Sequence, residues 1–271
     1  MPWDPDRYHK FQNERAAPFD DLMTLVHIRE NLRVIDLGCG TGELTRKLAD
    51  RLPGSDVIGI DTSPEMLARA AEHARPGLRF ERTAIEDVAG QWDLVFSHAA
   101  LQWVDNHPAL IPRLLSLARP GGQIAVQLPS NHSHPTHQLI VQIAGEEPFR
   151  SALGDWSRDW PVLGIDAYAE LLYAHGAEQI TVFEKVYPHV LENADALADW
   201  TSGTALVPYF ERLPESLHDP FMQEYRKRLR AQWPSSPVFL ASGGRCSRRC
   251  MPSSLRCIHR MTLLPVVCSV Q

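Results

Sequence analysis

The chain has no apolar run long enough to cross a membrane. A spanning helix needs about 20 predominantly apolar residues, and no such stretch occurs in the 271 residues. Residues 1–6 have neither a basic segment nor an apolar core, so they do not resemble a secretory signal. We therefore expect a cytoplasmic protein that has no membrane partner.

Basic residues are few outside the end of the chain. The sequence has 27 lysines and arginines against 33 acidic residues, and residues 241–271 hold five of those arginines and no acid. The first 240 residues therefore carry 22 basic and 33 acidic side chains. Nucleic-acid binding needs a basic surface, so no nucleic acid is expected. A small anionic substrate and a monomeric protein are expected instead.

A glycine-rich segment lacks the features of two common nucleotide-binding loops. Residues 36–42 read Asp-Leu-Gly-Cys-Gly-Thr-Gly, and Glu43 stands where the dinucleotide fingerprint has its third glycine. No Gly-Lys-Ser/Thr follows, which argues against a phosphate-binding P-loop. Asp61 ends the next apolar run, where a carboxylate can hold a ribose diol. The acid before the glycines disfavours a pyrophosphate and suits a ligand that carries an amine and a sulfonium.

Apolar runs alternate with helical patterns along the first two thirds of the chain. The expected strands are 32–37, 56–61, 78–83, 92–97, 123–128 and 179–187. A helix is expected at 17–31 and a turn at 120–122, and a later helical segment has Leu217, Phe221, Tyr225 and Leu229 at a spacing of four on one face. Near-continuous apolar strands separated by helices are typical of a parallel sheet that is covered on both faces. We therefore expect an α/β fold with a doubly wound, mostly parallel sheet. Residues 193–233 are mostly helical in pattern and are expected to form a lid over the carboxyl edge of the sheet, where such folds bind ligands.

The loop and its acid resemble motif I and the ribose-binding acid of class I S-adenosylmethionine (SAM) methyltransferases. More specific segments are similar to the trans-aconitate 2-methyltransferase family over residues 2 to 233. They are Trp3-x-Pro5-x-x-Tyr8-x-x-Phe11-x-x-Glu14-Arg15-x-x-Pro18, Leu101-Gln102-Trp103, Pro135-Thr136-His137 and Asp199-Trp200 followed by Gly203. This resemblance implies a seven-stranded Rossmann-like sheet, SAM as cofactor, and methyl-ester formation on a small polycarboxylate, with trans-aconitate as the leading choice.

The resemblance also implies where the cofactor binds. The family usually has an aspartate after the third strand that meets the adenine amine, whereas this chain has Ala84 there. The backbone N–H of Ile85, or the acids Glu86 and Asp87, are the alternatives. The predicted cofactor-binding residues are Asp36, Gly38, Cys39, Gly40, Asp61, Thr62, Ala84, Ile85 and His98.

An anionic acceptor needs counter-charge but no general base, because a carboxylate is already ionised at pH 7. Trp103 either lines the pocket or packs on the lid helices, and the N-terminal aromatic and basic face is either a flap or a surface helix. The predicted substrate-binding residues are Tyr8, Arg15, Gln102, Trp103 and His137, with Arg150 and Arg226 as further cations. His132, His134 and His137 lack metal-ligand spacing and a nearby carboxylate or thiolate, so no metal is predicted.

Composition and pattern divide the chain into four predicted segments. These are an N-terminal helical flap at 1–30, a SAM-binding domain at 31–190, a helical lid at 191–235 and an atypical tail at 236–271. The tail holds four of the five cysteines. It is interpreted as a zinc clip, a disordered basic extension or an out-of-frame ending, and the abrupt change near Leu240 favours the last. The seventh strand is then missing or altered, although 262–270 can form a strand if Pro265 is accommodated.

Three other functions stay open at this point. An NAD-linked oxidoreductase is disfavoured by Glu43. A SAM-binding protein that is catalytically impaired and a methyltransferase that acts on another small molecule are both compatible with the same motifs.

Overall fold

A computed structural model describes residues 12–154, 156–187, 189–240 and 266–270, which fall into two compact units. The sheet unit contains the described residues of Gln12–Pro129, Pro161–Lys185 and 266–270. The helical unit contains those of Ser130–Trp160 and 186–240. This division differs from the predicted segments, because the chain enters the helical unit at residue 130, returns to the sheet at 161 and leaves it again after 185.

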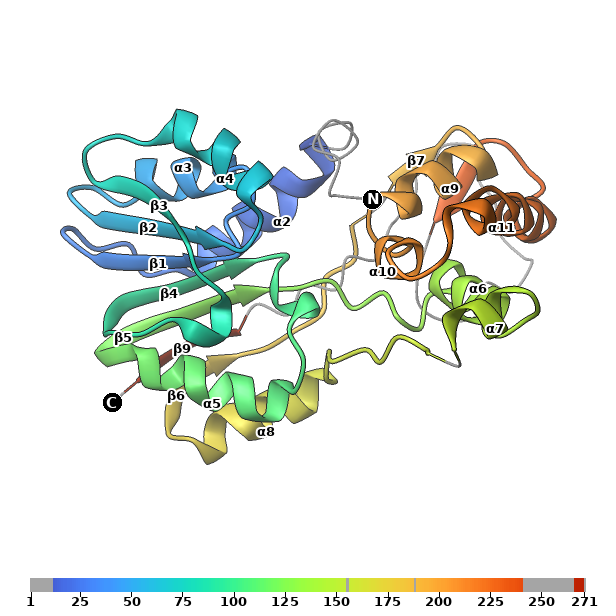
Figure 1. The fold of residues 1–271 in the computed structure, drawn as a ribbon. Helices are drawn as coiled ribbons and strands as arrows, with labels where there is room; N and C mark the ends of the chain where they lie inside the picture. Colours follow the sequence, from blue (N-terminus) through green and yellow to red (C-terminus); the bar gives the residue numbers. More distant parts are fainter. Residues whose placement is uncertain (1–11, 155, 188, 241–265, 271) are drawn as a thin grey trace. The chain divides into compact units, whose positions relative to one another are not determined.

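The sheet unit is built on a seven-stranded sheet with the order β3-β2-β1-β4-β5-β9-β6 (Figure 1). All neighbouring pairs are parallel except those made by β9, which is antiparallel to both β5 and β6. The strands are β1 (Arg33–Leu37), β2 (Asp56–Asp61), β3 (Leu78–Arg82), β4 (Trp92–His98), β5 (Ala118–Gln127), β6 (Ala177–Thr181) and β9 (Val266–Val270). The predicted doubly wound, mostly parallel, seven-stranded fold is therefore confirmed.

Helices cover both faces of this sheet (Figure 1). On one face, α2 (Gln12–Leu25) and α3 (Glu43–Asp50) pack on a core that includes Phe19, Leu22, Val34, Leu94 and Phe96. On the other face, α5 (His107–Leu117) and α8 (Ile165–Ala174) bury leucines and Tyr168 against the strands. Two buried faces explain why β1, β2 and β4 are almost continuously apolar.

The helix that follows β2 begins where a capping signal in the sequence predicts it. Ser63 caps α4 (Pro64–Ala70): its hydroxyl accepts a hydrogen bond from Met66 N at 3.2 Å, and Pro64 occupies the first turn. A 3-10 turn, η1 (Ala71–His73), continues this helix. The predicted turn at 120–122 lies instead within β5, where the register shifts between Trp92 and Leu94 of the neighbouring strand.

Several predicted boundaries were wrong, and two of them share a cause. The strand predicted at 179–187 is β6, which begins at Ala177 and ends at Thr181. The helix predicted at 17–31 is α2, which spans Gln12–Leu25 and buries Phe19, Leu22 and Met23 against the sheet. In both cases apolar residues continue along the sequence beyond the end of the element, so the predicted element extends too far.

The strand β9 takes the place between β5 and β6 that the sequence left in doubt. Its residues pair with Gln123–Val126 on one side and with Ala177, Glu178 and Thr181 on the other. Cys268 is buried in the core that β5 and α5 share. The alternative of a sheet without its seventh strand is therefore wrong; β9 begins at Val266, and Pro265 lies outside the described residues.

The helical unit has its own apolar core. Its elements are α6 (Pro135–Ala144), α7 (Phe149–Leu153), α9 (Ala194–Ser202), α10 (Val207–Phe210), η4 (Glu215–Leu217), α11 (His218–Gln232) and an antiparallel pair of strands, β7 (His189–Leu191) and β8 (Val238–Leu240). Phe221, Tyr225 and Leu229 are fully buried at the predicted spacing of four on α11. The mostly helical character predicted for 193–233 is confirmed.

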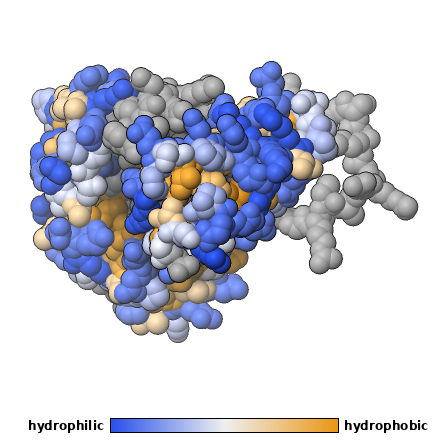
Figure 2. Space-filling model, turned by 45° about the vertical axis from the view of Figure 1, so that its right-hand side comes forward, coloured by the Kyte–Doolittle hydropathy of each residue, from blue (hydrophilic) through white to orange (hydrophobic). Residues whose placement is uncertain are grey.

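The surface is largely hydrophilic on the face drawn in Figure 2. Among the described residues the large apolar side chains that remain exposed are Ile28, Trp103, Val141, Tyr173 and Val190. Within the described ranges there is also no helix long and apolar enough to cross a membrane.

Candidate functional site

The glycine loop joins β1 to α3 at the carboxyl edge of the sheet. Gly38 and Gly40 have φ values of 78° and 54°, in the left-handed region that favours glycine. A Cβ on Gly38 would lie 2.2 Å from the Ala100 Cβ, so only glycine fits beside the segment that follows β4. A Cβ on Gly40 would meet nothing within 4 Å. The backbone at Gly40 therefore faces open space that a ligand can approach.

Asp61 fixes this loop from the end of β2. Its carboxylate accepts hydrogen bonds from Gly40 N at 3.0 Å and from Ser63 N at 2.9 Å. The backbone N–H groups of Gly38 and Cys39 also donate to Ile60 O, at 2.9 and 2.8 Å. Each carboxylate oxygen of Asp61 has used one acceptor position and keeps another. The loop is held from two directions, and the half-buried acid can still accept hydrogen bonds from a diol.

Asp36 lies below the loop and is almost fully buried. Its Oδ2 accepts a hydrogen bond from Thr45 Oγ1 of α3 at 2.6 Å. Burial raises the pKa of Asp36 from 3.8 to about 7; the Thr45 hydrogen bond opposes this rise, and the charge of Asp61 adds to it. An acid in this state loses its proton easily when a positive charge arrives nearby.

Cys39 is a buried member of the loop and not a nucleophile. Burial and the charges of Asp36 and Asp61 raise the pKa of its thiol. The reactive form of cysteine is the thiolate, so Cys39 contributes shape: its Cβ sits where a Cβ on Gly59 would come within 2.8 Å.

The predicted adenine region follows β3. Ala84 precedes the short turn η2 (Ile85–Asp87), in which Ile85 is buried, and Ala84 O accepts a hydrogen bond from Asp87 N at 3.0 Å. Thr62 is exposed after β2, and its carbonyl accepts a hydrogen bond from Arg82 Nε at 3.1 Å. The structure thus places these predicted residues beside Asp61 in the strand order.

The end of β4 carries three of the predicted residues. His98 is the last residue of the strand, and its ring packs edge-on against Phe19 with centroids 5.9 Å apart. Gln102 and Trp103 lie in the turn η3 (Leu101–Trp103). Gln102 is buried and its Nε2 donates to Ala99 O at 2.7 Å, whereas Trp103 is exposed. The exposed indole ring of Trp103 is therefore accessible to a ligand.

A buried hydrogen-bond network holds that turn in place. His107 Nε2 bonds Leu101 O at 2.9 Å, and His107 Nδ1 bonds the hydroxyl of Tyr168 on α8. That hydroxyl also accepts from Leu163 N at 3.2 Å. Burial lowers the pKa of His107, so the ring is neutral and needs one donor and one acceptor, which these partners supply. Sequence reasoning missed this network because its members are 61 positions apart.

His137 belongs to the helical unit. It is buried at the start of α6, its Nδ1 lies 3.0 Å from Thr136 Oγ1, and its ring meets Trp160 edge-on at 5.4 Å. Burial lowers its pKa to about 3, and the charges of His134, Arg158 and His132 add to that effect. His137 is therefore a neutral ring at pH 7, able to donate one hydrogen bond but not to supply positive charge.

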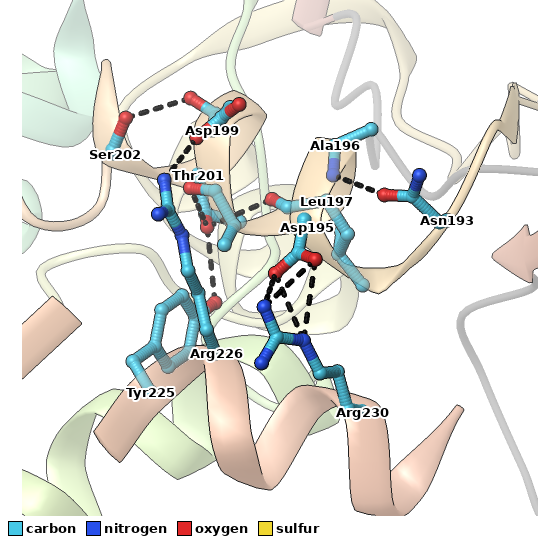
Figure 3. A network of polar contacts seen from close by, with 11 residues as sticks. Asn193, Asp195, Ala196, Leu197, Asp199, Thr201, Ser202, Tyr225, Arg226 and Arg230 are labelled. Atoms are coloured by element: carbon cyan, nitrogen blue, oxygen red, sulfur yellow. Dashed lines mark hydrogen bonds and ion pairs between the residues drawn. The ribbon is translucent and has the colours of Figure 1, made fainter. Parts of the chain in front are cut away.

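The predicted cations have mixed outcomes. Arg226 on α11 is paired with Asp199 of α9 at 2.6 Å (Figure 3). Arg150 is paired with Glu147 at 2.7 Å. Both therefore have partners within the helical unit. Arg15 lies in α2, but its side chain is outside the described part of the structure, as is Tyr8 altogether.

No cluster of three or more His, Cys, Asp or Glu residues suited to a metal ion is found among the described residues. His134 instead caps α6, where its Nδ1 accepts from Thr136 N at 3.2 Å. The zinc-clip interpretation of the tail rests on Cys246, Cys250, Cys257 and His259, all of which lie outside the described residues.

Comparisons with known proteins agree with this geometry. A family model described as a methyltransferase domain matches residues 28–160. A trans-aconitate 2-methyltransferase from Deinococcus radiodurans is 47% identical over 247 residues, which cover 89% of this chain and 95% of the relative. A protein of the same name from Variovorax paradoxus is 39% identical and covers 86% and 91%.

A solved structure shares the fold. It is phosphoethanolamine N-methyltransferase 2 of Haemonchus contortus in complex with phosphomonomethylethanolamine and S-adenosylhomocysteine, with a TM-score of 0.51. It is 15% identical, and the match covers 94% of this chain and 52% of that one. The identity to the Deinococcus protein over most of both chains is decisive. This chain therefore belongs to the trans-aconitate 2-methyltransferase family of class I SAM-dependent methyltransferases.

Proposed function

We propose that the protein transfers a methyl group from SAM to a carboxylate of trans-aconitate. The observation that carries this proposal is the 47% identity to a trans-aconitate 2-methyltransferase over 95% of that relative's length. The loop geometry supports the cofactor independently, because the space above Gly40 and the acceptor positions of Asp61 suit a nucleoside with a free ribose diol.

The residues around the loop fit SAM better than a dinucleotide. Asp36 and Asp61 place two acids beside the glycines; burial is the main cause of the raised pKa of Asp36, and the charge of Asp61 adds to it. A pyrophosphate would be repelled there, whereas a cation would be attracted. When bound, SAM supplies an electrophilic methyl group on a positively charged sulphur, and the acceptor oxygen takes that methyl group to give an ester and S-adenosylhomocysteine.

The tasks left to the protein are positioning and exclusion of water. The acceptor is already ionised, so no side chain has to remove a proton. Holding the carboxylate oxygen in line can contribute roughly 7–11 kcal/mol to the barrier reduction. The network of His107, Tyr168 and Leu163 fixes the turn that carries Gln102 and Trp103, which we propose as acceptor-side residues. The roles proposed for Tyr8, Arg15 and His137 in holding the acceptor stay predictions.

Incubation with methyl-labelled SAM and trans-aconitate tests this function. An active enzyme converts trans-aconitate to a labelled methyl ester and releases S-adenosylhomocysteine. Labelled SAM that is retained by the protein without ester formation would instead identify a SAM-binding protein. A panel of other small carboxylic acids, run in parallel, decides whether trans-aconitate is the preferred acceptor.

Several further expectations accompany this proposal. A monomeric state, a cytoplasmic location and the lack of a nucleic-acid partner stay predictions from composition. Size-exclusion chromatography with light scattering measures the first directly.

A further inference from the structure

A buried glutamine at the end of β5 has no partner for its amide. Gln127 is fully buried, and within the described part of the chain neither its Nε2 nor its Oε1 has a hydrogen-bond partner. An unsatisfied buried polar group costs about 1–3 kcal/mol, and native proteins contain few of them. Here one side chain leaves both a donor and an acceptor unused.

A second glutamine on the same strand shows that a buried amide on this face can find hydrogen-bond partners. Gln123 lies four residues earlier on β5 and on the same face. Its Oε1 accepts from His27 N at 2.8 Å and its Nε2 donates to His27 O at 2.9 Å. Both side-chain polar atoms of Gln123 thus have a partner in the chain after α2, whereas those of Gln127 have none among the described residues.

Gln127 lies at the edge of the sheet where the cofactor loop begins. It pairs in register with His98, and the preceding pair on the same face is Ala125 with Phe96, which in turn pairs with Asp36. Asp36, His98 and Gln127 therefore occupy the last two rows of one face, at the carboxyl ends of β1, β4 and β5. Open α/β sheets bind their ligands at this edge.

We propose that the Gln127 amide binds the amino-acid end of SAM. This inference rests on the proposed use of SAM as cofactor. An α-amino carboxylate presents an acceptor and a donor next to each other, so it can pair with Nε2 and Oε1 together. Trans-aconitate, ionised at pH 7, presents only acceptors and would leave Oε1 unpaired. The need for both partners therefore favours the cofactor over the acceptor.

Gln127 is fully buried, so ligand binding requires the side chains that cover it to shift. The helix α2 lies over this face, and its Phe19 packs edge-on against both Phe96 and His98, with centroids 5.8 and 5.9 Å apart. A shift of α2 would expose the amide and the ring of His98 together. Cofactor binding and the position of α2 are thereby linked.

The test compares Gln127→Leu with Gln123→Leu by calorimetry on the full chain. The ligands are SAM, S-adenosylhomocysteine and methylthioadenosine, which lacks the amino-acid end. Because hydrogen bonds to charged groups are the stronger ones, Gln127→Leu should weaken SAM and S-adenosylhomocysteine about 10- to 100-fold and leave methylthioadenosine unchanged. Its ligand-free melting temperature should stay the same or rise, because an unsatisfied amide is removed.

Gln123→Leu should do the opposite, lowering the melting temperature and leaving all three affinities within about twofold, because it breaks two hydrogen bonds remote from the edge. Equal affinities in wild type and Gln127→Leu overturn the inference. So does an equal loss for all three ligands, which means general damage, or a raised KM for trans-aconitate with SAM binding unchanged. Failure of the wild type to bind any of the three would instead refute the proposed function.

Discussion

A single residue, Asp36, is expected to make both the stability of the protein and its affinity for a cationic cofactor depend on pH. Its pKa of about 7, against 3.8 as the ordinary value, means that the folded protein holds this proton more tightly than the unfolded chain does. The stability contributed by the protonated acid is full below pH 4 and is lost as the pH rises to 7, by about 4 kcal/mol at about 1.4 kcal/mol per unit. Asp36→Asn keeps an acceptor for Thr45 and removes this loss.

We therefore expect Asp36→Asn to be more stable than the wild type at pH 8 and similar to it at pH 4, as measured by urea unfolding. The same variant should bind SAM less well at pH 8, because an ionised Asp36 attracts the sulfonium. In the wild type the ratio of SAM to S-adenosylhomocysteine affinity should rise between pH 6 and 8. A ratio that does not depend on pH would show that Asp36 does not respond to the cofactor charge.

Asp61 is predicted to matter for both loop geometry and ligand affinity. Asp61→Ala removes the acceptor for Gly40 N and Ser63 N and the carboxylate for the ribose diol. We expect the affinity for SAM and S-adenosylhomocysteine to fall at least tenfold, since hydrogen bonds to a charged group are worth about 1.5–3 kcal/mol.

Ser63→Ala is the matched control for Asp61→Ala. It removes the cap of α4 but leaves the Asp61 carboxylate in place. It should cost about 1 kcal/mol of stability and little affinity. If both variants bind SAM as the wild type does, the ribose role of Asp61 is refuted.

At the scale of elements, the link between α8 and η3 gives a further prediction. Tyr168→Phe removes the hydroxyl that bonds His107 and Leu163 N, and leaves buried groups without partners. We expect a loss of about 1–3 kcal/mol in unfolding free energy and a raised KM for the acceptor, because Gln102 and Trp103 lose their support.

Tyr173→Phe, on the same helix but 79% exposed, is the control and should change neither quantity. Steady-state kinetics together with urea unfolding distinguish the two variants. A Tyr168→Phe enzyme with unchanged KM would mean that the network stabilises the fold without positioning η3.

The elements also show what the sequence could and could not reveal. Strands β1, β2 and β4 were predictable, since burial on both faces demands continuous apolar residues. The cofactor loop was predictable because positive φ and close approach select glycine. The partners Thr45, Tyr168 and Gln127 were not, because their roles depend on contacts or register between distant segments. A glutamine that ends the apolar run Ile124–Val126 was the available signal for Gln127.

At the scale of the molecule, the two units are interleaved along the chain. The sheet unit takes residues on both sides of 130–160, and its strand order brings the end of the chain between β5 and β6. Hydrophobic periodicity identifies helices but not the core that each helix joins, so the segment boundaries predicted at 30 and 190 differ from the division into the two units. The out-of-frame interpretation of the tail stays a prediction that resequencing around codon 240 tests, and it no longer requires an absent seventh strand.

The strand β9 leads to the last prediction, which concerns the stability of the whole sheet. A chain that ends at residue 265 lacks the strand that pairs with both β5 and β6, and it exposes two strand edges. At about 1 kcal/mol for each backbone hydrogen bond, the loss is on the order of 5 kcal/mol, or roughly 10–20 °C in melting temperature. Within the intact chain, Cys268→Asp should destabilise far more than Ser269→Asp, because Cys268 is buried and Ser269 is half-buried. Equal melting temperatures for the full and shortened chains would show that β9 does not hold the sheet together in solution.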